Sequence, residues 1–312
     1  MKALVATDYG EPPSNLELAE VPDPVPGPGQ LLVRIEAASL NPFDLKQISG
    51  AMREMAPLTF PHMVGMDGTG RVVGVGDGVT EFSEEEAVAG FFGAHPGTIA
   101  ERAVIDVGPA VSRRPGAVDA VHAAAMPESG MTALALWRAA ALRSGDSVLV
   151  IGATGGIGMF LVQFAAAEGV HAIATASEDD AAYVRNLGAA DVVDYRSAGV
   201  VEEALRLRPE GVDAVIDLIG MGEAISISAR AAREGGRLVS PLGGPEGLDR
   251  DVSAVYIGSF VPRQGDLEAL LGQVADGSLR VEVSRTFTLD EAPAAVADFA
   301  HAHTRGKVVI TN

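Results

Sequence analysis

Residues 148–169, VLVIGATGGIGMFLVQFAAAEG, form the stretch that says most about the fold. The pattern predicts a buried strand that ends at Gly152, a glycine-rich turn over 153–158 and a helix that begins as the turn ends. This arrangement fits the dinucleotide-binding fingerprint, with alanine in place of its first glycine. Gly155 would let the backbone approach a pyrophosphate closely, and Gly158 would let the helix pack tightly against the strand. The residues expected to hold the phosphates are Ala153, Thr154, Gly155, Gly156 and Ile157.

Short apolar runs alternate with stretches of helical spacing around and after this turn. The runs expected to be strands are 147–152, 171–176, 190–194, 212–220, 236–243 and 253–260. Strands that alternate with helices imply right-handed crossovers and a parallel, doubly wound α/β sheet. The first 110 residues are instead β-rich, and the last 50 or so contain two expected helices and two expected strands, the final one at 307–311. No GxxxxGK[ST] motif occurs, which excludes a mononucleotide P-loop.

Composition narrows the class of partner. The 312 residues include no cysteine, which excludes disulfides, thiolate nucleophiles and zinc sites built on cysteine. The net charge of −19 repels nucleic acid and anionic membranes, so neither is expected as a partner. The expected partner is a small molecule. No apolar run reaches the roughly 18 residues of a membrane span. The apolar patch at the start of the chain soon meets Asp8, and it is too short for a signal-peptide core. We therefore expect a cytoplasmic protein.

Ser177 follows the second expected strand of the α/β region, where an acid would bind the adenosine ribose and repel a 2′-phosphate. Serine leaves room for that phosphate. However, Ser177 also fits the N-cap of the next helix, with Glu178, Asp179 and Asp180 as its acidic first turn. These three carboxylates would oppose a 2′-phosphate unless they point outward. The two interpretations of Ser177 carry equal weight.

Several motifs in order along nearly the whole chain resemble one family. They include VPDPVPGPGQLLVRIEAASLNPFD, GMDGTGRVVGVGDGV, GMTALALW, the glycine-rich turn and the terminal RGKVVI. Together they resemble the zinc-free quinone oxidoreductase branch of the medium-chain dehydrogenase/reductase superfamily. The resemblance implies a GroES-like, β-rich substrate and catalytic domain over 1–120, completed by 261–312. It also implies a six-stranded Rossmann domain over 121–260.

The resemblance also bears on metal chemistry. Where zinc-dependent members of the superfamily carry a cysteine and a His-Glu pair, this chain has Asn41–Asp44 and Gly65–Asp67. A tetrahedral zinc site cannot be assembled from these residues, so no metal is expected. A conjugated acceptor such as a quinone spreads the charge that develops during hydride transfer. The protein's task would then be orientation and exclusion of water.

The resemblance further implies roles for single residues. Asn41 corresponds to a residue that hydrogen-bonds the nicotinamide-side ribose and the substrate region, with turn formation before Pro42 as its alternative role. Asn41 and Lys46 are the candidate catalytic residues, although Asp44 and Lys46 could simply be solvated in the same turn. No side chain is an evident general acid, so solvent or a substrate-bound water is expected to give the final proton. The further residues expected to contact the cofactor are Thr132, Tyr195, Arg196, Ile219, Gly220, Leu242, Gly243, Phe260, Val261 and Lys307.

Two of these assignments have structural alternatives: Thr132 could be a helix-start hydroxyl, and Tyr195 a surface aromatic beside Arg196. The leading functional hypothesis is an NADPH-dependent quinone reductase that transfers hydride from nicotinamide C4. An enone or enoyl reductase, or an NADPH-binding protein without turnover, are the alternatives. The apolar, proline-free edge segment near Val255–Gly258 predicts a homodimer, because such an edge is otherwise open to aggregation.

Overall fold

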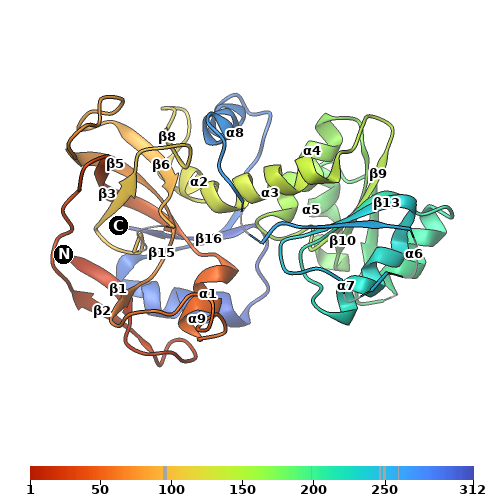
Figure 1. The fold of residues 1–312 in the computed structure, drawn as a ribbon, viewed down its shortest axis with the longest axis horizontal. Coiled ribbons are helices and arrows are strands. Elements are labelled where there is room, and N and C mark those ends of the chain that lie inside the picture. Colours follow the sequence, from red (N-terminus) through yellow and green to blue (C-terminus); the bar gives the residue numbers. More distant parts are fainter. Residues whose placement is uncertain (94–96, 198, 246, 249–250, 259) are drawn as a thin grey trace. The chain divides into compact units, whose positions relative to one another are not determined.

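The computed structural model describes residues 1–312 except 94–96, 198, 246, 249–250 and 259 (Figure 1). The chain forms two compact units. Met1–Ser129 and Pro262–Asn312 make the N-terminal unit, and Gly130–Val261 makes the central unit.

The central unit is built on a six-stranded sheet in the order β11-β10-β9-β12-β13-β14. Every neighbouring pair in this sheet is parallel. The strands are β9 (Ser147–Ile151), β10 (His171–Ala176), β11 (Asp191–Asp194), β12 (Val212–Asp217), β13 (Ala232–Ser240) and β14 (Ser253–Tyr256). The order reverses on either side of β9, which is the switch point of a doubly wound Rossmann fold. The predicted fold class is therefore confirmed.

Helices join the parallel strands of this sheet, as crossovers require. They are α4 (Gly158–Ala167), α5 (Ala181–Asn186), α6 (Val200–Leu207) and α7 (Glu223–Ser228). Helix α3 (Pro127–Ala140) leads into the unit. Strand β9 is buried along almost its whole length, and α4 buries seven of its ten residues. Burial on all sides explains why this strand and helix are almost entirely apolar in sequence.

The N-terminal unit is mostly antiparallel. Strand β1 (Lys2–Ala6) lies between β2 (Leu16–Glu20) and β4 (His62–Met63) in a three-stranded sheet. A seven-stranded sheet has the order β15-β16-β3-β5-β6-β8, with β7 also paired to β3. Its strands are β3 (Gln30–Ser39), β5 (Asp67–Val75), β6 (Ala87–Phe91), β7 (Arg102–Asp106), β8 (Val111–Arg113), β15 (Val283–Thr288) and β16 (Lys307–Thr311). Its helices are α1 (Pro42–Ile48), α2 (Ala120–Ala124), α8 (Asp266–Ala275) and α9 (Ala292–His301).

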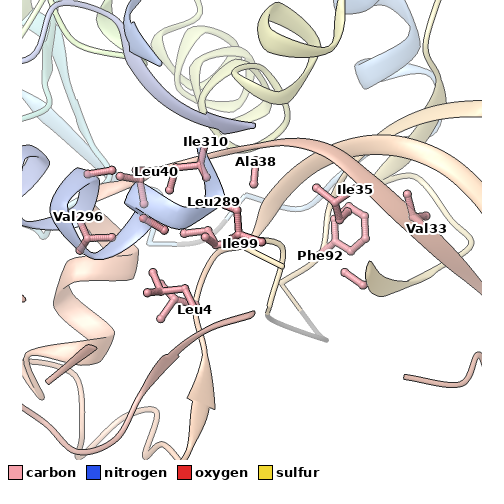
Figure 2. Packing of buried hydrophobic residues seen from close by; sticks show 14 of the residues in the cluster. Leu4, Val33, Ile35, Ala38, Leu40, Phe92, Ile99, Leu289, Val296 and Ile310 are labelled. Carbon is pink, nitrogen blue, oxygen red and sulfur yellow. The ribbon is translucent and has the colours of Figure 1, made fainter. Parts of the chain in front are cut away.

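The C-terminal strand completes this unit. Strand β16 pairs antiparallel with β3, with Ile310 opposite Ala38. The side chain of Asn312 donates to the carbonyls of Ile35 and Ala100, at 2.9 Å each. The core beneath joins both chain segments, since Leu40 and Ile99 pack with Leu289, Val296 and Ile310 (Figure 2).

Some element ends differ from the sequence-based expectation. The strand expected at 253–260 ends at Tyr256, and Ser259 lies outside the described residues. The strand expected at 236–243 runs instead over Ala232–Ser240, because a register shift against β12 accommodates extra residues near its start. No helix in the described part of the chain is long and apolar enough to cross a membrane.

Candidate functional site

The glycine-rich turn leaves β9 through Gly152, whose φ of +87° is a backbone conformation that favours glycine. The Gly152 amide donates to Thr175 Oγ1 on β10 at 3.0 Å, which ties the turn to the neighbouring strand. Gly155 N–H then donates to Gly152 O at 3.3 Å, and α4 begins at Gly158. The sequence motif did not reveal the anchoring role of Thr175, because it comes from another strand.

The two outer glycines of the turn serve different needs. A Cβ at Gly158 would lie 2.2 Å from Gly152 O and 2.6 Å from Ala153 Cα, so the fold itself requires glycine there. A Cβ at Gly155 would meet only Gly152 O, at 3.6 Å, which is ordinary contact. The fold therefore does not require glycine at position 155, and the lack of a side chain there leaves the backbone open to a ligand. The N–H groups of Met159, Phe160 and Leu161 at the start of α4 donate to the turn carbonyls of Gly155 and Ile157 at 3.0–3.3 Å. The positive end of the helix dipole nevertheless favours an anion beside the turn.

Ser177 lies just beyond β10 and is 2% exposed. Its hydroxyl donates to Asp180 Oδ2 at 3.2 Å, and it makes no N-cap hydrogen bond to the following turn. Glu178 and Asp179 are exposed, whereas Asp180 is only 3% exposed. Two of the three carboxylates therefore point outward, as a bound 2′-phosphate would require. Asp180 does not, because its hydrogen bond with Ser177 holds its side chain against the protein.

Tyr195 and Arg196 follow β11, the neighbour of β10 in the sheet. The register places Asp194, at the end of β11, opposite Ala176 at the end of β10, so both strand exits lie at the same edge. Tyr195 is 43% exposed, and the Arg196 guanidinium lies over its ring at 5.7 Å from the ring centre. Tyr195 and the positive charge of Arg196 therefore lie at the same edge of the sheet as Ser177.

The loops after β12 and β13 reach the same carboxyl edge. Asp217, 1% exposed, accepts the backbone N–H of Ile219 at 2.9 Å and of Gly220 at 2.7 Å. This fixes the loop and leaves Ile219 66% exposed. Leu242 N–H is held in the same way by Ser240 Oγ at 3.1 Å. Sequence reasoning missed Asp217, although an acid that ends a buried strand was a usable signal.

The remaining expected cofactor contacts in the central unit differ in exposure. Gly243 and Phe260 are half-buried, and Val261 is 82% exposed. Thr132 is buried and is the sixth residue of α3, in its second turn rather than at the helix start.

A second polar site lies inside the N-terminal unit, where β3, β5 and β16 adjoin. Asn41, which precedes α1, donates from Nδ2 to Asp67 Oδ2 at 3.0 Å. Lys307 Nζ donates to Asn41 Oδ1 and lies 3.9 Å from Asp67 Oδ2. Asp67 also accepts from Ser39 Oγ at 3.1 Å and, through Oδ1, from the backbone N–H of Glu128 at 2.9 Å. Asn41, Asp67 and Lys307 are all buried, and we refer to these three as the Asn41 network.

The structure therefore brings together Asn41 and Lys307, which the sequence analysis had selected, and adds Asp67 to them. Lys46 is not part of the Asn41 network. It is half-buried on α1, and its ammonium makes no hydrogen bond or ion pair with the residues that the structure describes.

Asp44 is a buried carboxyl next to this network. Its Oδ2 accepts the Asn41 backbone N–H at 2.8 Å, while its Oδ1 has no hydrogen-bond partner among the described residues. Burial raises the pKa of Asp44 to about 7, with the nearby Asp67 raising it further and Lys307 lowering it. Burial also raises the pKa of Asp67 to about 7, against the opposing effect of Lys307.

The raised pKa of Asp44 predicts a pH-dependent stability. The folded chain binds this proton more tightly than the unfolded chain, so the stabilisation is complete below about pH 4 and is lost as the pH rises through 7. Asp44→Asn removes the titration, so we expect the variant to gain a few kcal/mol over wild type at pH 8 compared with pH 4. Urea unfolding at the two pH values measures this, with the exposed Asp77→Asn as control. An equal difference between variant and wild type at both pH values would contradict the raised pKa.

A Rossmann sheet with an open glycine turn, together with a β-rich unit that holds a buried polar network, defines the class as a dinucleotide-dependent dehydrogenase or reductase. Comparisons agree with this class. The alcohol dehydrogenase GroES-like domain family matches residues 27–113, and the zinc-binding dehydrogenase family matches residues 187–310.

Individual relatives extend the match to the whole chain. A chloroplast envelope quinone oxidoreductase homolog of Arabidopsis thaliana is 31% identical over 99% of this chain and 98% of its own length. A polyketide synthase of Streptomyces halstedii is 33% identical over 91% of this chain but only 5% of its own length. A mycobacterial protein solved in complex with NADPH has 26% identity and a TM-score of 0.86, with both chains covered completely. The chain belongs to the quinone-oxidoreductase branch of the medium-chain dehydrogenase/reductase superfamily, and it is an oxidoreductase.

The name of one matching family raises the question of zinc, and the residues do not fit it. The chain has no cysteine, and the described residues contain no group of three or more His, Asp or Glu that could hold a metal ion. The Lys307 ammonium already supplies a positive charge beside Asp67, at 3.9 Å from its Oδ2. A divalent ion there would face that like charge.

Proposed function

We propose that the protein is an NADPH-dependent quinone reductase that works without zinc. The observation that carries this proposal is the glycine turn, where Gly155 is kept open although the fold has room for a side chain. The match to a quinone oxidoreductase homolog along 99% of the chain supports the choice of acceptor. The buried cation Lys307, in place of metal ligands, supports a zinc-free site.

NADPH, when bound, supplies a hydride from nicotinamide C4. In this proposal the central unit is the dinucleotide-binding domain, where residues 153–157 and the start of α4 hold the pyrophosphate. Ser177, Tyr195 and Arg196 hold the adenosine end. The loops after β12, β13 and β14 line the rest of the cofactor through Ile219, Gly220, Leu242, Gly243, Phe260 and Val261, and Thr132 contributes from α3.

The N-terminal unit is the substrate and catalytic domain of this proposal. Asn41 and Lys46 are its candidate catalytic residues, and Asn41 and Lys307 are its candidate cofactor contacts. The quinone takes up the hydride with its two electrons and one proton from solvent, which gives the hydroquinone and NADP⁺. The chain's own contribution is orientation and exclusion of water.

An assay of NADPH oxidation with a panel of quinones and a panel of enones tests the function. We expect turnover with quinones that a chelator does not change. Turnover with enones alone favours the alternative, a reductase of α,β-unsaturated carbonyls, for which the similarity to a polyketide synthase is the specific observation. Nucleotide binding without turnover in either panel would instead indicate a non-catalytic NADPH-binding protein.

Arg196 provides a test of cofactor choice. A guanidinium–phosphate pair is charge-assisted, and its loss costs about 1.5–3 kcal/mol, or roughly ten- to a hundredfold. We expect Arg196→Ala to lower kcat/KM for NADPH by about tenfold and to leave kcat/KM for NADH unchanged. Arg206→Ala on α6, where Arg206 pairs with Glu203 at 2.8 Å, is the matched control.

The buried Asp180 acts in the opposite direction, since its charge disfavours a phosphate near Ser177. A wild-type kcat/KM tenfold higher with NADH than with NADPH would show that the acidic turn determines cofactor choice. It would refute the proposed preference for NADPH. Equal losses with both cofactors in Arg196→Ala would refute the role of this residue.

We also propose a homodimer formed through β14, which is the last strand in the order of its sheet and carries the 54% exposed Tyr256. A single monomer mass by light scattering at micromolar concentration would contradict the dimer. The cytoplasmic location stays a proposal that cell fractionation can test.

A further inference from the structure

Lys307 is a buried cation to which the proposed reaction assigns no chemical step. It begins β16 and is 3% exposed, and its partner Asn41 lies 266 residues away in sequence. Burying an ammonium costs several kcal/mol, and an ion pair offsets that cost only with good geometry and further hydrogen bonds. Well-packed apolar residues often stabilise such a position as well or better. A purely structural need therefore does not account for a lysine here.

Asp67 is the counter-charge of Lys307 and is more fully bonded. One oxygen accepts from Ser39 Oγ at 3.1 Å and Asn41 Nδ2 at 3.0 Å, and the other accepts from Glu128 N–H at 2.9 Å. The Lys307 ammonium lies 3.9 Å away. These contacts favour the ionised carboxylate and oppose the burial that raises the pKa of Asp67 to about 7, so Asp67 carries its charge above that pH.

Between these two charges, the Asn41 carboxamide has one favourable orientation. Its Oδ1 accepts from the ammonium and its Nδ2 donates to the carboxylate. A flipped amide would place its N–H groups against the ammonium and its oxygen against the carboxylate. The charges on either side therefore fix and polarise the amide.

The Nδ2 group carries two hydrogens, and only one is used within the described structure. Asp67 accepts the first, and the second has no acceptor among the described residues, although Asn41 is completely buried. An unpaired buried donor costs about 1–3 kcal/mol, which a ligand oxygen at this position would recover.

We propose that Lys307 and Asp67 are positioning residues, which hold the Asn41 amide so that its free N–H donates to the substrate oxygen that gains negative charge on hydride transfer. The inference rests on the proposed reductase function. The electron balance is unchanged: the hydride brings two electrons to the acceptor, and solvent supplies the proton. A preorganised donor at a developing oxyanion contributes about 10²–10³-fold to the rate.

The test uses a variant that removes both charges together. Single changes would leave one charge buried without its partner, and such changes are strongly destabilising. The double variant Lys307→Met/Asp67→Asn is neutral and close in shape. Asparagine accepts through one oxygen only, so a hydrogen bond from Ser39 and Asn41 or from the Glu128 N–H is lost. We therefore expect a folded protein with a melting temperature about 2–12 °C below that of wild type. We expect its kcat at saturating NADPH to fall about 10- to 100-fold. The NADPH Kd is measured separately by fluorescence titration, because Lys307 is also a candidate cofactor contact.

Lys2→Met is the matched control, because Lys2 is a partly exposed lysine of the same unit that pairs with Asp290. It should keep full activity. Adding Asn41→Ala to the double variant should cause little further loss in kcat, since residues that act through one group are non-additive. A purely structural role would not produce this pattern.

Three outcomes would overturn the inference: wild-type kcat in the double variant, full additivity with Asn41→Ala, or a loss of NADPH affinity that accounts for the whole effect. Failure of the proposed function is visible separately in the wild-type enzyme. If only enones are reduced, the same comparison applies, because their carbonyl oxygen also gains charge. If neither panel turns over, the positioning role is refuted together with the reductase function.

Discussion

Gly158→Ala is expected to destabilise the central unit by about 3 kcal/mol or more, because overpacking against fixed atoms costs about this much. The added Cβ would lie 2.2 Å from Gly152 O and 2.6 Å from Ala153 Cα, and both are backbone atoms that cannot rotate away. At roughly 2–4 °C per kcal/mol, we expect Tm to fall by about 6–12 °C. Thermal unfolding followed by circular dichroism measures this.

Gly272→Ala in α8 is the control for this variant. A Cβ at Gly272 meets nothing within 4 Å, so alanine should be neutral or stabilise the helix by about 0.5–1 kcal/mol. A wild-type Tm for Gly158→Ala would mean that the strand and helix do not approach as closely as described.

Gly155→Ala, only three residues earlier, is expected to leave Tm unchanged and to abolish tight cofactor binding. The fold has room for its Cβ, whose one neighbour, Gly152 O, is 3.6 Å away. The same methyl group would occupy the space through which the backbone approaches the pyrophosphate in the proposed complex. A clash of about 1.4–3 kcal/mol raises the NADPH Kd by roughly 10- to 150-fold.

Isothermal titration with NADPH measures this change, and Gly108→Ala, where a Cβ also meets nothing within 4 Å, is the control. Unchanged affinity in Gly155→Ala would show that the phosphates do not pass over this glycine. A fall in Tm would show that the position serves the fold. The pair of glycine variants therefore separates folding from binding within a single turn.

Thr175 and Asp217 anchor loops of the central unit, and they show which contacts could not be predicted from the sequence. The turn that carries Gly155 and Gly158 was visible because strand, turn and helix are contiguous, and local periodicity reports local structure. Asp217 and Thr175 were missed because they act on backbone N–H groups whose demand for an acceptor appears only when the strands are assembled. The sequence left the direction of the Asp180 side chain open for the same reason, because its burial depends on what packs against it and not on its place in an acidic run.

By itself, the sequence determined the Rossmann order of alternating strands and helices, the dinucleotide turn and the absence of cysteine ligands. Each of these depends on neighbouring residues or on composition. Only the tertiary structure placed Lys307 against Asn41 and Asp67, and thereby showed a carboxamide held between two buried charges. The physical reason is that β16 reaches β3 by antiparallel pairing across nearly the full length of the chain, and no local pattern encodes such a contact.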